Sequence, residues 1–242
     1  MNTQPSPIIL ALDTDSAEDA RQLATLLKDD IAMVKVGLQL FAAEGPEFVK
    51  ELTENGVRVF LDLKLHDIPN TVAGAAVEAA RMGVSMLTLH TLGGARMLVE
   101  TKQRLEALSE AEGILIPRLL GVTILTSLDE DDLSELGMKR GVHSSVAILA
   151  DLALRSGLEG IVASPHELNL LQLEDRQELL CVIPGIRPEG TSVDDQRRSM
   201  TPGEAISKGA DYLVIGRPIT RAPDPLEAVR SINRQVSMAR RG

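Results

Sequence analysis

The sequence predicts a single-domain TIM barrel, a (β/α)8 fold, and three observations support this prediction. Eight short apolar runs rich in Val, Ile and Leu follow one another without the strict polar alternation of a half-exposed sheet. Segments with helical periodicity lie between most of these runs. The length of 242 residues suits eight strand–helix units, and no linker or change of composition divides the chain.

The apolar runs are interpreted as parallel strands that are covered on both faces. In chain order they are Ile8–Asp13, Met33–Gly37, Val57–Lys64, Ser85–His90, Leu119–Leu125, Gly160–Ser164, Leu179–Pro184 and Tyr212–Gly216. A doubly wound open sheet is the alternative architecture, but it rarely contains eight evenly spaced units of this kind.

The helices are predicted from their start signals and from apolar stripes. Ser16 can cap the first helix, because Asp19 stands at the third helical position. The stripe of this helix consists of Ala20, Leu23, Ala24 and Leu27. Similar periodicity follows the third run at Ala73, Ala76, Val77 and Ala80, and precedes the sixth run over Val142–Arg155.

Composition excludes several classes of protein. The chain is 44% hydrophobic and 25% charged, which is typical of a globular protein, and its net charge of −10 argues against nucleic acid as a partner. A single cysteine, Cys181, excludes a disulfide framework. No apolar run reaches the roughly 18 residues of a membrane span, and Met1–Pro5 lacks the pattern of a signal peptide. We therefore expect a cytoplasmic protein without a membrane partner.

Charged residues interrupt the third apolar run. Side chains two residues apart on a strand share a face, so Leu61, Leu63 and Leu65 are expected to face the helices. Asp62 and Lys64 then point into the barrel mouth, where catalytic groups of TIM barrels lie. Buried charges are costly unless they pair, so the alternative is an ion pair that only fixes strand register.

Further charges stand at neighbouring strand ends and favour a catalytic role. Asp13 ends the first run, Lys35 lies in the second and Asp67 follows the third. Five charges of alternating sign are thus expected at one mouth. Two carboxylates beside Lys64 favour its charged form, which predicts a proton donor rather than a Schiff-base nucleophile.

Glycine and arginine follow both of the last two runs, where TIM barrels bind phosphate. Gly185 and Arg187 follow the seventh run, and Gly216 and Arg217 follow the eighth. Glycine allows close approach of the backbone, and arginine binds two oxygens at once. The sequence therefore predicts a phosphate site, with ordinary glycine turns and surface arginines as the alternative.

The segment 187–201 is long and polar, with almost no apolar anchor. Such a segment beside a phosphate site predicts a mobile lid that closes over the ligand, with Gln196 as a contact. The predicted domain therefore spans residues 1–242 as one barrel with this lid.

The decapeptide Asp62–Thr71, with the sequence DLKLHDIPNT, resembles the signature of the bacterial-type orotidine 5'-phosphate decarboxylase family. The resemblance extends over nearly the whole chain in five further blocks, which are Leu10–Asp13, Lys35–Gly37, Gly121–Ser127, Pro184–Pro188 and Ile215–Ile219.

This resemblance implies cofactor-independent and metal-independent decarboxylation of orotidine 5'-phosphate to uridine 5'-phosphate and CO2 in de novo pyrimidine biosynthesis. It also implies a catalytic network of Lys35, Asp62, Lys64 and Asp67, in which Lys64 protonates C6 of the pyrimidine. Asp62 lies beside the departing carboxylate in this scheme.

The resemblance further implies a homodimer with active sites at the interface, where Asp67, Ile68 and Thr71 reach the partner's site. The remaining substrate contacts that it implies are Asp13 and Lys35 for the ribose, Thr126 and Ser127 for the pyrimidine, Gln196, Gly216 and Arg217 for the phosphate, and Arg187 at the lid.

Two other functions are compatible with parts of this pattern. A metal-dependent sugar-phosphate decarboxylase or epimerase on a related barrel shares the phosphate end and the Asp-x-Lys strand. The four histidines have no close metal-ligand spacing, but magnesium bound by carboxylates alone stays open. A phosphate-ligand sensor without catalysis is the second alternative, and it is expected to have lost a charge of the network.

Overall fold

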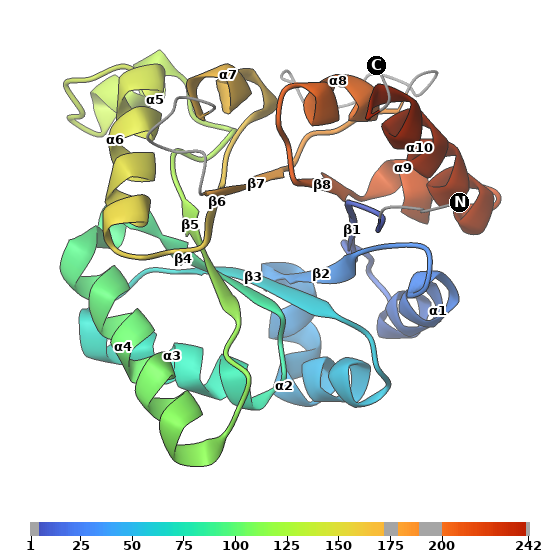
Figure 1. The fold of residues 1–242 in the computed structure, drawn as a ribbon, viewed down its shortest axis with the longest axis horizontal. Coiled ribbons are helices and arrows are strands. Elements are labelled where there is room, and N and C mark those ends of the chain that lie inside the picture. Colours follow the sequence, from blue (N-terminus) through green and yellow to red (C-terminus); the bar gives the residue numbers. More distant parts are fainter. Residues whose placement is uncertain (1–4, 172–178, 189–199, 241–242) are drawn as a thin grey trace.

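The computed structural model describes residues 5–171, 179–188 and 200–240 and contains a closed barrel of eight parallel strands in the order β1 to β8 (Figure 1). This confirms the predicted fold class. The strands are β1 (Ile8–Ala11), β2 (Met33–Gly37), β3 (Val59–Leu65), β4 (Met86–His90), β5 (Arg118–Val122), β6 (Gly160–Val162), β7 (Leu180–Ile183) and β8 (Tyr212–Ile215).

Helices surround the barrel and connect successive strands (Figure 1). The α-helices are α1 (Ala17–Leu27), α2 (Leu38–Glu54), α3 (Pro69–Arg81), α4 (Gly94–Glu112), α5 (Glu130–Glu135), α6 (Val142–Arg155), α7 (Leu168–Leu171), α8 (Pro202–Ser207), α9 (Arg217–Thr220) and α10 (Pro225–Ala239). Two short 3-10 helices are η1 (Thr91–Gly93) and η2 (Pro165–Glu167). None of the helices in the described ranges combines the length and the apolar character that crossing a membrane requires.

The sequence signals give the elements they predicted. The hydroxyl of Ser16 accepts a hydrogen bond from the backbone N–H of Asp19 at 3.2 Å, as expected for the start of α1. The predicted helix Val142–Arg155 is α6, and each of the eight apolar runs overlaps a strand. Several runs extend beyond their strands at the carboxyl end, because β1 ends at Ala11 and β5 at Val122. The residues that follow leave the sheet to form the barrel mouth.

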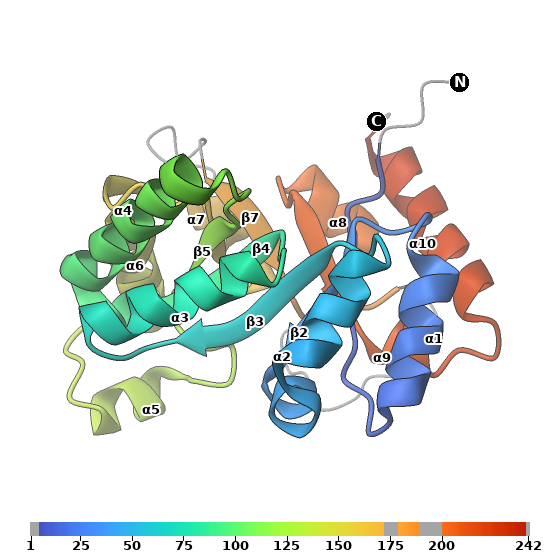
Figure 2. The same cartoon turned by 90° about the horizontal axis from the view of Figure 1, so that it is seen from below.

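Two apolar cores hold this fold together. The inner core fills the barrel with side chains from alternate strand positions, among them Ile9, Phe60, Met86 and Val182. The outer core lies between the strands and the helices and contains Leu61, with Leu63 and Leu65 packed against it. Figure 2 shows β3 running between α2 and α3. The predicted outward direction of these three leucines is therefore confirmed, and Asp62 and Lys64 face inward.

Candidate active site

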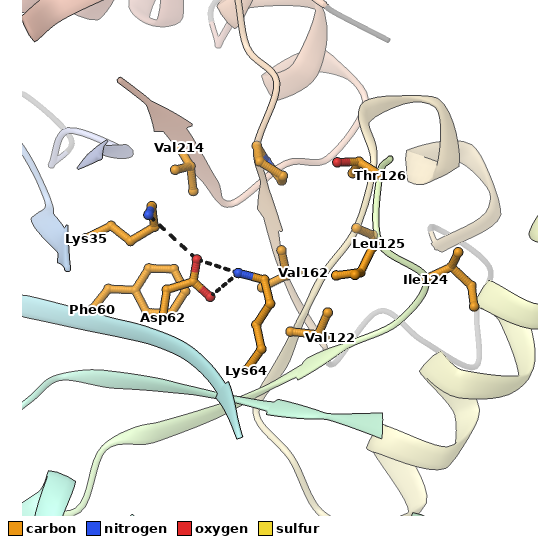
Figure 3. A pocket seen from close by; sticks show the side chains of 12 residues that line it. Lys35, Phe60, Asp62, Lys64, Val122, Ile124, Leu125, Thr126, Val162 and Val214 are labelled. Atoms are coloured by element: carbon orange, nitrogen blue, oxygen red, sulfur yellow. Dashed lines mark hydrogen bonds and ion pairs between the residues drawn. The ribbon is translucent and has the colours of Figure 1, made fainter. Parts of the chain in front are cut away.

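A pocket opens at the carboxyl ends of the strands and has one charged wall (Figure 3). The Lys64 Nζ donates to Oδ1 and Oδ2 of Asp62 at 2.9 and 3.0 Å. The Lys35 Nζ lies 3.7 Å from Asp62 Oδ2 and donates to Asp13 Oδ1 at 3.1 Å. These four residues form a continuous chain of ion pairs across β1, β2 and β3, which we call the charge relay.

Pairing makes the burial of these charges tolerable. Lys35 and Asp62 are buried, with relative exposures of 8% and 9%, and each would pay a large desolvation cost alone. Asp62 is held between the buried ammonium group of Lys35 and the half-buried ammonium group of Lys64, so its negative charge is compensated from both sides. Asp13 is largely exposed at the outer end, where its side chain keeps 61% of its accessible surface.

Gly37 leaves room for the lysine end of the relay. A Cβ atom built at this position would lie 2.9 Å from Lys35 Nζ and 3.5 Å from Asp13 Oδ1. Any larger residue would push the ammonium group away from its partner. The glycine in the Lys35–Gly37 block is therefore explained by space rather than by a special backbone angle.

The strand that carries Asp62 and Lys64 is irregular. Leu61 of β3 pairs with Leu87 of β4, but Leu65 pairs with Leu89, so three residues of β3 stand opposite one residue of β4. Such a β-bulge locally redirects the side chains of its strand. Within it, Lys64 has a φ of 51°, the left-handed backbone region that non-glycine residues rarely adopt.

The residue opposite the bulge is Thr88, which sequence reasoning missed. Its hydroxyl accepts a hydrogen bond from the backbone N–H of Lys64 at 2.8 Å and donates one to Asp62 Oδ1 at 3.0 Å. Thr88 has no exposed surface. A signal was present, because this hydroxyl stands between Leu87 and Leu89 in the interior of the fourth apolar run.

The wall opposite the charge relay is apolar, and the sequence did not predict it. It consists of Val122 of β5, Val162 of β6, Val214 of β8 and Ile124 in the loop after β5 (Figure 3). Phe60, one inward position before Asp62 on β3, also lines the pocket. These side chains look like ordinary strand residues in the sequence, and only closure of the barrel brings them together.

The predicted pyrimidine contacts lie in the loop after β5. Thr126 lines the pocket, and Ser127, the next residue, is exposed. Asp67, Ile68 and Thr71 lie at the start of α3 and are all exposed. The Asp67 carboxylate accepts a hydrogen bond from the N–H of Ile68 at 2.6 Å, and among the described residues no ion pair joins it to the charge relay. The relay within one chain thus contains four of the five predicted charges.

The predicted phosphate residues follow two adjacent strands. Pairing of Ile183 with Leu213 brings the ends of β7 and β8 together. Gly185 has a φ of 79°, which only glycine adopts easily, and Gly216 lies against Ala11 of β1. Arg187 and Arg217 are both half-buried.

The two ends of the predicted lid are joined. Ile186 forms an isolated parallel bridge with Met200, and the Arg187 N–H donates to the Met200 carbonyl at 2.9 Å. Gln196, the predicted phosphate contact, lies outside the described residues.

His90 at the end of β4 stands beside the site and has an unusual environment. Its ring stacks on that of His66, with 5.2 Å between the centroids, and its Nδ1 has no hydrogen-bond partner within the described residues. Burial, together with the nearby His66 and Lys64, lowers the pKa of His90 to about 4. His90 is therefore neutral at physiological pH.

Metal-binding side chains do not cluster in the part of the chain that the structure describes. No three His, Cys, Asp or Glu residues there converge in a way that could hold a metal ion. The residues around the pocket instead offer two fixed ammonium groups, one buried carboxylate and an apolar wall. Fold and pocket together define a TIM-barrel protein with the charged site of an enzyme.

Comparison with known proteins identifies the family. Residues 6–232 match the model of the Orotidine 5'-phosphate decarboxylase / HUMPS family, and the chain belongs to this family. It is 48% identical over 225 residues to orotidine 5'-phosphate decarboxylase of Geotalea daltonii, covering 93% of each chain. It is 46% identical over 229 residues to the enzyme of that name from Actinobacillus pleuropneumoniae, covering 95% of this chain and 98% of the relative.

Solved structures agree with this assignment. The crystal structure of orotidine 5'-phosphate decarboxylase from Lactobacillus acidophilus superposes with a TM-score of 0.84 at 38% identity, covering 96% of this chain and 99% of the other. The resemblance inferred from the decapeptide is thus confirmed at the level of the family. The comparisons give no support to the metal-dependent alternative.

Proposed function

We propose that this chain is a carbon–carbon lyase that decarboxylates orotidine 5'-phosphate to uridine 5'-phosphate and CO2 in pyrimidine biosynthesis, without a cofactor. The observation that carries the proposal is the Lys35–Asp62–Lys64 part of the charge relay, which lines the pocket of a chain that belongs to this family. The names of the relatives, and the fact that the similarity covers nearly the whole of both chains, support the proposed substrate and reaction.

Lys64 is the acid in this proposal. When the bond from C6 to the carboxylate carbon breaks, its electron pair stays on C6, where no adjacent group can delocalise it. A fixed ammonium group stabilises that negative charge as it develops and then transfers a proton to C6. Lys64 is left as a neutral amine and regains its proton from solvent after product release.

Asp62 has two opposing effects in this scheme. A carboxylate about 4 Å from the substrate carboxylate would repel it by about 4 kcal/mol at an effective dielectric of 20, which corresponds to about a thousandfold in rate if fully relieved. However, Asp62 is paired with both Lys35 and Lys64, and these two ammonium groups offset its repulsion of an anion. The geometry therefore favours stabilisation of the transition state, with Asp62 chiefly fixing the two ammonium groups.

The apolar wall suits the other product. Carbon dioxide is uncharged, whereas a carboxylate loses solvation on entering an apolar site. Val122 and Val162 line the same pocket as Asp62 and Lys64, so the leaving group meets apolar side chains as bond cleavage removes its charge. The same wall excludes water and strengthens the electrostatic effect of the lysines.

The remaining substrate contacts are proposed for a nucleotide that is bound with C6 at Lys64. Asp13 and Lys35 then hold the ribose hydroxyls, and Thr126 and Ser127 contact the pyrimidine. The phosphate then lies at the ends of β7 and β8, where the adjacent strand ends support the proposal. Its contacts are Gln196, Gly216 and Arg217, with Arg187 at the lid.

The segment 187–201 is proposed as the mobile lid. Its two ends are joined through Ile186 and Met200, which gives a closing segment a fixed base beside the phosphate site. Contacts with the remote phosphate supply binding energy that closure converts into catalysis at C6.

We also infer a homodimer in which Asp67, Ile68 and Thr71 complete the partner's site. Large apolar side chains are exposed in the segments after four consecutive strands, β2 to β5, and so share one edge of the barrel. They are Leu38, Ile68, Leu92 and Leu125, with exposures of 60, 67, 45 and 36%. The exposed Asp67 beside them supports a role in another chain's site. The cytoplasmic location expected from the sequence belongs to the same proposal.

The test is ultraviolet-monitored loss of orotidine 5'-phosphate by the purified protein in excess chelator. Fast turnover that is insensitive to the chelator is expected. Absence of turnover by folded protein would contradict the proposal. Activity on a sugar phosphate that appears only with added magnesium would favour the metal-dependent alternative.

A further inference from the structure

We propose that Thr88 is a positioning residue that holds the Lys64 ammonium group and the Asp62 carboxylate in register for proton transfer. This inference rests on the proposed function. Thr88 is uncharged and does not itself contribute a charge to the site. Its effect is instead exerted through the bulge of β3, the irregular segment that carries both groups.

Because of the bulge, Thr88 of β4 stands opposite two inward-facing residues of β3, whereas in a regular ladder it would stand opposite one. Side chains alternate along a strand, so Asp62 and Lys64 both point inward from the three bulged residues. Thr88 is the single inward residue of β4 opposite them. A hydroxyl at this place can serve both neighbours, whereas an apolar side chain can serve neither.

The Thr88 hydroxyl acts both as an acceptor and as a donor of hydrogen bonds. Its oxygen accepts the backbone N–H of Lys64, and its one hydrogen is donated to Oδ1 of Asp62. The same Oδ1 accepts the Lys64 Nζ at 2.9 Å. Thr88 thus ties the backbone of Lys64 to the carboxylate that holds its ammonium group.

The backbone of Lys64 requires such support. Its φ of 51° is unfavourable for a lysine, and conformations of this kind persist where surrounding contacts enforce them. The N–H of Lys64 is turned away from a regular ladder by the bulge, and Thr88 supplies its partner in a fully buried setting. Loss of the hydroxyl leaves a buried N–H unsatisfied and frees Lys64 to adopt another backbone conformation.

The experiment compares Thr88→Val, which removes only the hydroxyl, with Thr88→Ser, which keeps it. Thr101→Val is a matched control, because Thr101 is also fully buried but its hydroxyl donates to the Met97 carbonyl within α4. We expect Thr88→Val to lower kcat by about 10- to 100-fold, with KM and the Kd of uridine 5'-phosphate changed less than about threefold. Thr88→Ser is expected to restore kcat to within about threefold, and Thr101→Val to leave it unchanged.

A second measurement follows the environment of the Lys64 amine through its chemical reactivity and does not require turnover. Acetic anhydride labels lysine amines, and mass spectrometry gives the rate for Lys64 in each variant at one pH. We expect several-fold faster labelling in Thr88→Val than in the wild type, Thr88→Ser or Thr101→Val. If the wild type does not decarboxylate the nucleotide but this difference persists, the proposed function fails while the role of Thr88 stands. Equal labelling and equal kcat in Thr88→Val and wild type, or equal losses in the Val and Ser variants, would overturn the inference.

Discussion

The two walls of the pocket differ in chemistry and also in backbone. The charged wall comes from β2 and β3, and it contains a bulge and a lysine with positive φ. The apolar wall comes largely from β5, β6 and β8, where β5 and β6 pair without a shift and Val122 lies directly beside Val162. Irregular backbone is thus concentrated where charges must be aimed, whereas a wall that only excludes water needs no departure from regular strands.

The energetic demands on the two walls explain this difference. An ammonium group stabilises a carbanion only if it is already in place, because moving it during the reaction costs reorganisation energy. Apolar contacts have no such directional requirement. We therefore expect substitutions in the charged wall to act mainly on the chemical step and to be severe, and those in the apolar wall to be milder.

The largest effect is expected for Lys64→Ala. Removal of the proton donor and of its charge should lower kcat by at least about 10⁴-fold, or about 5.5 kcal/mol. Binding of uridine 5'-phosphate should change far less, because the phosphate end is intact. Turnover measurements and titration with the product separate the two. Lys50→Ala, at a half-buried lysine of α2 that does not line this pocket, is the control. Loss of product binding as large as the loss of turnover would contradict the assignment of Lys64 as the acid.

A mixing experiment tests whether the charged wall continues into a second chain. Asp67→Ala and Lys64→Ala are each expected to be inactive. In a mixed dimer one site lacks both groups and the other regains both, so random subunit exchange should restore about a quarter of wild-type activity. Native mass spectrometry confirms the exchange. If mixed dimers form without any gain in activity, each site is built from a single chain.

The sequence was sufficient to predict the charged residues of the pocket, but not the uncharged residues beside them. Asp62 and Lys64 break an apolar run, and such a violation is visible in one dimension. Val162 obeys the pattern of its strand, and the partners of the Thr88 hydroxyl are shown only by the register of the closed barrel. The bulge itself has no sequence signal here, because no glycine or proline marks it.

The fold was predicted better than the ends of its elements. Apolar periodicity specifies eight strands, but it continues past the last strand residue into the mouth, as at Leu12 and Ile124, both of which are buried. The apolar pattern indicates which residues are buried, not which residues belong to a strand. Residues at the mouth are buried although they lie beyond the strand ends. The contribution of a second chain cannot be predicted from periodicity at all.

The apolar wall is expected to respond more mildly. Val162→Thr keeps the shape of the side chain and adds a hydroxyl opposite the charge relay. A polar group there favours the carboxylate over CO2, so kcat should fall by about tenfold, or about 1.4 kcal/mol, with product binding almost unchanged. Val77→Thr on α3, outside the pocket, is the control. An effect as large as that of Lys64→Ala would remove the distinction between the walls.

The smallest effect concerns stability at the edge of the charged wall, at His90. Its pKa is lowered to about 4 in the folded chain, chiefly by burial, whereas an unfolded histidine has a pKa of 6.5. Between these values the unfolded chain binds more protons, so the free energy of unfolding falls as pH decreases from 6.5 toward 4. Because the ring is only partly buried, we expect this group to contribute about 1 kcal/mol of the loss between pH 7 and pH 5.

Urea unfolding of the wild type and of His90→Gln at both pH values measures that contribution. Glutamine does not titrate, so the variant should lose about 1 kcal/mol less than the wild type on acidification, whatever its stability at pH 7. His143→Gln, on α6 and exposed, is the control, and it should leave the difference between the two pH values as it is in the wild type. Equal losses in wild type and His90→Gln would mean that the ring accepts a proton in the folded state. A proton on His90 would then be held against the nearby positive charge of Lys64.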